Sequence, residues 1–264
     1  MAKPKVLIIT GYGINCDEET KFAFEMAGGK GEQVHINDLI ESPNRLSSYQ
    51  MIAFPGGFSY GDDTGSGNAL AWKIKNNLGI ERLLEGEKLI IGICNGFQVL
   101  VNLGLLPAID GKYGERQVAL NHNVSSRYID RWVDLKFHGA SPWIKDIEKI
   151  SLPIAHGEGN FYAEQDVIDD LIQEGQIAVK YTKGQMCEYL DLPANPNGSM
   201  EDIAGITDSS GRIFGLMPHP ERAINLTHYP NWRNIKDRAT REGREISEVG
   251  DGLKIFANGV RYWE

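Results

Sequence analysis

Lys88-Leu89-Ile90-Ile91-Gly92-Ile93-Cys94-Asn95-Gly96-Phe97-Gln98 is the stretch that decides the fold of this chain. Its first half, residues 89–93, is apolar without alternation, which is typical of a parallel strand covered on both faces. The apolar residues after Asn95 recur with helical spacing as far as Gly104, where we expect the helix to end. The stretch therefore predicts a buried strand, a sharp turn and a helix.

Cys94 stands at this turn, two residues from Gly92 and two from Gly96. Gly-x-Cys-x-Gly has the spacing of a nucleophile elbow, in which glycines allow close packing while the central side chain projects from a strained turn. A helix N-terminus also favours the thiolate, the form of cysteine that attacks. An isolated cysteine after an apolar strand is more often a small core residue. Here the paired glycines and the polar Asn95 and Gln98 favour a catalytic nucleophile.

The composition sets limits on location and partners. The chain has 264 residues, of which 41% are hydrophobic and 24% charged, as in ordinary globular proteins. Its net charge of −9 argues against nucleic-acid binding. No apolar stretch approaches the roughly 18 residues of a membrane span, and the first residues lack a signal-peptide core. The three cysteines are too few and too scattered for a disulfide framework. We therefore expect a cytoplasmic protein with no membrane or nucleic-acid partner.

Strand and helix signals alternate through the first part of the chain. Such a pattern predicts a mostly parallel sheet with ligands bound beyond the carboxyl ends of its strands. The expected strands are residues 6–10, 33–37, 51–54 and 89–93, and the expected helices begin at 17, 66 and 95.

Beyond Gly111 the strand signals follow one another without long helices, which favours antiparallel pairing. The expected strands here are residues 117–120, 131–137, 150–155, 177–181, 203–207 and 212–217, with a short helix at 166–174. We expect one domain over residues 1–264, in which 225–264 form an extended tail and a closing amphipathic helix.

Two glycine-rich segments follow predicted strands. Gly11-Tyr12-Gly13-Ile14-Asn15-Cys16 matches a dinucleotide-binding loop weakly, because its third glycine is missing, and we expect Cys16 to be structural. The second segment is residues 55–63. Its Gly56-Gly57 pair has three possible interpretations: a phosphate-binding loop, a structural turn or an oxyanion hole. The neighbouring Asp62 and Asp63 would repel phosphate. We expect backbone N–H groups of Gly56-Gly57 to face the elbow, as an oxyanion hole requires.

A cysteine nucleophile needs a base, and the base needs an orienting group. His156-Gly157-Glu158 and His219-Pro220-Glu221 each follow an apolar strand and offer both groups. Residues i and i+2 at a strand end point the same way, so the glutamate can hold the imidazole. We expect His219 to be the base, because prolines fix its backbone whereas glycines leave His156 loose. The order Cys94, His219, Glu221 also disfavours an α/β-hydrolase, in which the acid precedes the histidine.

These segments resemble a known family. Residues 92–98 together with 218–221 are similar to the class I, triad-type glutamine amidotransferases. Three further segments narrow the resemblance to the glutaminase subunits of phosphoribosylformylglycinamidine synthase, in purine biosynthesis: residues 55–62, the pattern Asn123-x-Ser125-x-Arg127-x-x-x-Arg131-Trp132-Val133, and residues 153–159. The likeness covers residues 6–221, and the tail at 225–251 has no assigned role.

The resemblance implies a flavodoxin-like α/β fold, a mostly parallel sheet with helices on both faces and an antiparallel strand extension. It implies that Cys94 attacks glutamine, that His219 transfers protons and that Glu221 orients His219. It also implies an oxyanion and substrate pocket at Gly56, Gly57, Phe58, Asn95, Gln98, Asn123 and Ser125. From residues alone, the polar loop 121–127 holds a small polar substrate or is merely solvated. His156 and Glu158 are expected to form a partner-contact or ammonia-exit loop.

The resemblance further implies partners: an ATP-dependent synthetase subunit that receives the ammonia, and a small third subunit. No cofactor or metal is expected on this chain, because ATP and Mg²⁺ would be used by the synthetase. The alternatives are an amidotransferase of another pathway, a flavodoxin-like cysteine hydrolase or isomerase, and a binding protein with an inactive site.

Overall fold

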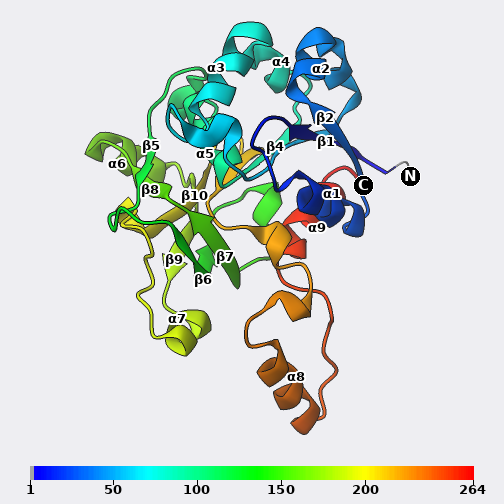
Figure 1. Ribbon diagram of the computed structural model, residues 1–264, viewed down its shortest axis with the longest axis vertical. Coiled ribbons are helices and arrows are strands. Elements are labelled where there is room, and N and C mark those ends of the chain that lie inside the picture. Colours follow the sequence, from blue (N-terminus) through cyan, green and yellow to red (C-terminus); the bar gives the residue numbers. More distant parts are fainter. Residues whose placement is uncertain (1–2) are drawn as a thin grey trace.

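The sheet at the centre of the molecule orders the whole fold. The computed structural model describes residues 3–264, and its main strands are β1 (Lys5–Thr10), β2 (Lys30–His35), β3 (Met51–Phe54), β4 (Leu89–Ile93), β6 (Ile129–Phe137), β7 (Lys149–His156), β9 (Ile177–Thr182), β10 (Ile203–Thr207) and β11 (Ile213–Leu216). Over those residues they form one nine-stranded sheet in the order β2-β1-β3-β4-β11-β10-β9-β6-β7 (Figure 1). A separate pair joins β5 (Ala119–His122) to β8 (Glu158–Tyr162).

The two halves of the main sheet differ in strand direction. From β2 to β11 every neighbouring pair is parallel, and from β11 to β7 every pair is antiparallel. β1 to β4 alternate with helices, because each parallel pair needs a long crossover. β11 comes last among the strands of residues 3–264: it follows β10 through a short antiparallel connection and pairs with β4 in parallel. The predicted parallel sheet with an antiparallel extension is confirmed.

Helices cover the parallel half on both faces. α1 (Asp17–Met26) and α9 (Leu253–Arg261) pack together on one face, and α3 (Asn68–Asn77) and α5 (Asn95–Asn102) pack together on the other. The remaining α-helices are α2 (Ile36–Glu41), α4 (Ile80–Leu84), α6 (Gln165–Gln173), α7 (Gln185–Leu190) and α8 (Trp232–Arg241). α8 lies on an arm that projects from the body, as Figure 1 shows at the bottom of the view.

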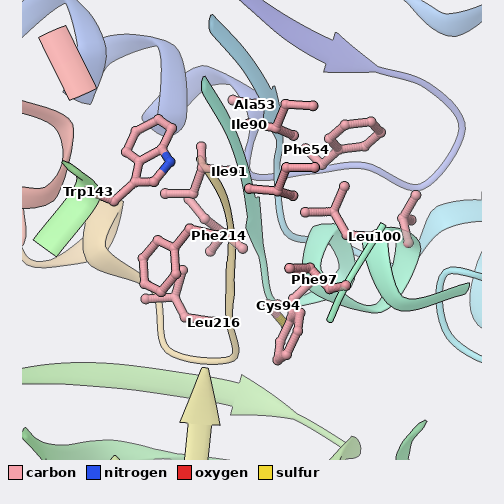
Figure 2. Packing of buried hydrophobic residues seen from close by; sticks show 14 of the residues in the cluster. Ala53, Phe54, Ile90, Ile91, Cys94, Phe97, Leu100, Trp143, Phe214 and Leu216 are labelled. Atoms are coloured by element: carbon pink, nitrogen blue, oxygen red, sulfur yellow. The ribbon is translucent and has the colours of Figure 1, made fainter. Parts of the chain in front are cut away.

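The core is built on β4. All five of its residues are buried, and Figure 2 shows Ile91 facing the side of Trp143 and Phe214 while Phe54 and Leu100 lie on the other side. A strand with two buried faces gains from apolar residues at every position, roughly 1.5–3 kcal/mol for each large side chain. The unbroken apolar run of the sequence therefore becomes the central strand that carries Cys94.

Some elements differ from those expected. β2 begins at Lys30, three residues before the expected start, and ends at His35 because residue 36 opens α2. β8 and α7 were not expected. β5 pairs with β8 and not with the strand at 131–137, because the chain folds back sharply after His156. No helix within residues 3–264 is long and apolar enough to cross a membrane.

Candidate active site

Cys94 occupies a strained turn between β4 and α5. Its φ of 52° and ψ of −108° lie outside the regions that side chains usually adopt. Its N–H donates to the Leu216 carbonyl oxygen at 2.8 Å, which fixes the turn against β11. A Cβ added to Gly96 would lie 1.8 Å from the Phe54 carbonyl oxygen, so only glycine fits there. The expected elbow geometry is confirmed.

His219 and Glu221 follow β11, the parallel neighbour of β4, so their strand ends at the same edge of the sheet as the elbow. Glu221 Oε1 lies 2.6 Å from His219 Nδ1, the length of a strong charge-assisted hydrogen bond. Both side chains are buried, and the His219 N–H donates to the Pro153 carbonyl oxygen at 2.8 Å. The predicted pairing of imidazole and carboxylate two residues apart is confirmed.

The charge on His219 is set by its neighbours. Burial alone would lower the pKa of His219, but the Glu221 carboxylate, followed by the thiols of Cys94 and Cys16, raises it well above its usual value. His219 Nε2 is buried and has no regular hydrogen bond within residues 3–264. With Nδ1 held by Glu221, Nε2 is the nitrogen available for proton transfer with Cys94 or a bound substrate.

The Gly56-Gly57 turn lies against this pair. A Cβ on Gly56 would stand 2.8 Å from His219 Cε1, and a Cβ on Gly57 would stand 2.6 Å from the Gly13 carbonyl oxygen. The Gly56 carbonyl oxygen accepts from the Cys16 N–H at 3.2 Å, and the Phe58 N–H donates to Gly13 at 2.8 Å. Residues 11–16 thus form a platform for the turn, and the N–H of Gly57 is not used by it.

Phe58 and Tyr128 form the exposed edge of the site. Their ring centroids are 6.2 Å apart and both side chains are exposed. Partial burial of the phenol, followed by the charge of Cys94, raises the pKa of Tyr128. Phe58 was expected at the site and Tyr128 was not, because nothing in the loop pattern 121–131 marks it.

Asn95 and Gln98 bind protein groups. Asn95 Oδ1 accepts from the Ser59 N–H at 3.3 Å, and its Nδ2 donates to Asp62 and to Gln98 Oε1, each at 3.2 Å. Gln98 Nε2 donates to the Glu158 carbonyl oxygen at 2.7 Å. The two amides therefore join the elbow helix to the 55–63 loop and to the 156–159 turn.

Asn123 and His156 form a buried pair of their own. His156 Nδ1 lies 3.1 Å from Asn123 Oδ1, and Asn123 Nδ2 donates to the carbonyl oxygens of Arg127 and His156 at 2.9 and 2.8 Å. Burial, followed by the charge of His219, lowers the pKa of His156 to about 3. The expectation that neighbouring glycines leave His156 loose is wrong: Ala155 precedes the histidine, and the missing side chain of Gly159 makes room for the ring to pack.

Ser125 and Glu158 lie outside the His219 cluster. Ser125 is exposed, and its hydroxyl accepts from the Arg127 N–H at 3.3 Å. Glu158 Oε2 accepts from the Ser66 N–H at 3.1 Å, and this carboxylate lines a polar cavity of about 350 Å³ that Gln98 and His122 also line. Gln98, on the elbow helix, is thus part of the wall of this cavity.

Cys16, which we expected to be merely structural, lies beside the His219–Glu221 pair. The ligand atoms of Cys16, His219 and Glu221 lie within 4.8 Å of one another. Such a set could hold Zn²⁺ by its chemistry, but His219 Nδ1 is already bonded to Glu221. The signal that could have found Cys16 is its place after the first strand, since β1 is parallel to β3 and ends at the same edge.

Comparison with known proteins shows the family of this chain. Residues 3–263 match the family described as CobB/CobQ-like glutamine amidotransferase domain. The chain is 48% identical over 98% of its length to phosphoribosylformylglycinamidine synthase subunit PurQ of Methanococcus maripaludis, covering 97% of that protein. It is 46% identical to the PurQ subunit of Dehalococcoides mccartyi, over 99% of this chain and 98% of that one. Among solved structures it resembles a chain of PurLQS from Thermotoga maritima, with a TM-score of 0.73, 34% identity and full coverage of both chains. The chain therefore belongs to the glutamine amidotransferases, in the family of the PurQ subunits.

Proposed function

We propose that this chain is the glutaminase subunit of phosphoribosylformylglycinamidine synthase and that Cys94, His219 and Glu221 carry the reaction. The observation behind the residue assignment is the meeting of three elements at one sheet edge: the Cys94 elbow, the His219–Glu221 pair and the Gly56-Gly57 turn. Family membership supports the glutamine chemistry.

Cys94 thiolate attacks the side-chain carboxamide carbon of glutamine and forms a C–S bond, which places negative charge on the carboxamide oxygen. The N–H groups of Gly57 and Asn95 stabilise this oxyanion, since Asn95 is the first residue of α5 and its N–H has no intrahelical partner. His219, protonated and held by Glu221, gives its proton to the leaving nitrogen from Nε2.

The C–N bond then breaks and releases ammonia, which leaves a thioester on Cys94. His219, now neutral, takes a proton from water, and the resulting hydroxide attacks the thioester carbon. Collapse of this second intermediate breaks the C–S bond, releases glutamate and restores the thiolate. Glu221 keeps the imidazole oriented and stabilises its charged form through both steps.

The ammonia is used by another subunit. We assign ATP and Mg²⁺ to an ATP-dependent synthetase subunit, with a small third subunit in the same complex; the PurLQS relative supports this arrangement. Glu158 and the polar cavity beyond Gln98 are the proposed exit or contact region, since the Gln98 amide joins the elbow helix to that turn. Three buried cysteines without disulfides fit a reducing compartment, and we place the protein in the cytoplasm.

The proposal is tested by trapping the nucleophile. The chain, in complex with its synthetase, is treated with an electrophilic glutamine analogue and the adduct is located by peptide mapping. We expect one adduct, on Cys94, that glutamine suppresses by competition. An adduct on Cys16 or Cys187 would overturn the residue assignment. A chain that turns over no glutamine with its partners present would be a cysteine hydrolase or a binding protein instead.

A further inference from the structure

Cys16 lies between two cationic side chains that flank the proposed active site. Arg222 Nη2 donates to Cys16 Sγ at 3.0 Å, and Arg222 is held in turn by Glu19 Oε1 at 3.3 Å. On its other side the sulfur faces the imidazole of His219, since both line the space above Gly56, where an added Cβ would stand 3.1 Å from Cys16 Sγ and 2.8 Å from His219 Cε1.

The backbone of Cys16 is also held by hydrogen bonds. The residue is 1% exposed, its N–H donates to the Gly56 carbonyl oxygen at 3.2 Å, and its carbonyl oxygen accepts from Thr20 Oγ1 at 2.6 Å. The thiol donates to Asn15 Oδ1 at 3.3 Å. Burial raises the pKa of the Cys16 thiol although His219 and Arg222 oppose the rise, so the group is a neutral thiol at pH 7.

We propose that Cys16 is a positioning residue for His219: its thiol keeps the imidazole apart from the Arg222 guanidinium and braces the ring in the orientation in which Nδ1 meets Glu221. The inference rests on the proposed function of this site and adds to the site a residue from the loop between β1 and α1. Cys16 takes no part in bond making, since the glutamine carbon bonds only to Cys94.

The physical argument is one of charge and shape. His219 carries a positive charge in the resting state, and a second fixed cation beside it would favour the neutral ring. A polarisable sulfur that accepts from Arg222 fills the gap between the cations without adding charge of its own. A smaller side chain would leave the imidazole free to tilt, and a small displacement of a catalytic group costs rate more than it costs binding.

The test compares Cys16→Ala and Cys16→Ser with Cys187→Ala in the assembled complex. Cys187 is a matched control, because it is equally buried at 2% exposure but lies in α7, beside β6. We expect Cys16→Ala to lower kcat by at least about tenfold, with KM within about twofold. The alkaline limb of the kcat/KM profile should move to lower pH, since the neutral form of His219 becomes favoured. Cys16→Ser should restore most of kcat and bring the alkaline limb back to its wild-type pH. Cys187→Ala should match the wild type in both measurements.

The outcomes are separable. An alkaline limb that stays at its wild-type pH in Cys16→Ala would overturn the positioning role, whatever the rate. So would a Cys16→Ser variant as impaired as Cys16→Ala while its thermal unfolding is unchanged. If Cys16→Ala does not fold, the limb of Cys16→Ser decides alone: a wild-type pH supports the role and a lower pH with a lost rate contradicts it. Loss of the proposed function itself appears differently, as a wild-type complex without glutamine turnover.

Discussion

The molecule contains the same His-x-Glu pattern at two strand ends, and the two copies have opposite chemistry. His219 follows β11, and its Glu221 raises its pKa well above the usual value. His156 ends β7, and burial lowers its pKa to about 3. His219 is therefore charged at neutral pH and His156 is not. A short pattern places two groups near one another in the chain, but their surroundings decide what they can do.

The difference lies in the residues that come after each histidine. Pro220 starts a 3-10 helix, Pro220–Arg222, which turns Glu221 back onto the ring. Gly157 is followed at once by β8, which carries Glu158 away to the Ser66 N–H. His156 has Asn123 as its partner instead, a neutral amide that supplies no negative charge to offset a positive ring.

The largest expected effect separates the two histidines by activity. His219→Ala should lower glutaminase kcat by about 10³-fold or more, because it removes the group that moves both protons. His156→Ala should retain measurable activity, because its ring is held by Asn123 and is neutral. Steady-state rates of the two variants in the assembled complex test this. The reverse order of activities would exchange their roles.

A second expected effect separates them by the pH dependence of stability. The pKa of His156 is lowered on folding, so the unfolded chain binds the proton more tightly and stability is lost as pH falls below about 6.5. The loss for this one group approaches about 1.4 kcal/mol per pH unit between the two pKa values. His219 has the opposite sign: its contribution is complete below about 6.5 and is lost as pH rises through its raised pKa.

Urea unfolding between about pH 5 and about pH 8 measures this contrast. His156→Asn, whose amide can still donate to Asn123, should flatten the acid side of the stability curve relative to the wild type. Parallel curves for the wild type and His156→Asn would show that His156 is not a buried neutral histidine.

The smallest expected effect concerns the polar loop that was expected to bind substrate. Ser125→Ala should change the free energy of unfolding by less than about 0.5 kcal/mol and KM for glutamine by less than about twofold, since its exposed hydroxyl accepts from the Arg127 N–H within the same turn. Kinetics and unfolding of this variant check both numbers. A KM raised about tenfold would restore Ser125 to the substrate pocket.

Much of the fold was predictable because its signals are local. The apolar run 89–93 and the glycines around Cys94 specify a buried strand and an elbow whatever surrounds them. A closing amphipathic helix within 225–264 was also expected, and α9 is found at Leu253–Arg261. β8 was missed because its residues, Glu158–Tyr162, are short and mixed in polarity, and their pairing with β5 is a long-range contact.

The candidate site was predictable only in part, for the same reason. Cys94, His219 and Glu221 carry local patterns, and the structure brings the elements that hold them to one edge of the sheet. Asn123 was expected to meet substrate, but its amide is bonded to His156 and to the 127 and 156 carbonyl oxygens. No local pattern distinguishes an amide that binds a ligand from one that anchors a loop.

The sequence by itself determined the buried strand at 89–93, the strained turn at Cys94 and the closeness of His219 to Glu221, because each depends on residues within a few positions of one another. Only the tertiary structure decided that Cys16 faces His219 and that His156 is neutral. Both depend on burial and on charges contributed by distant segments, which become neighbours only when the parallel strands align their carboxyl ends.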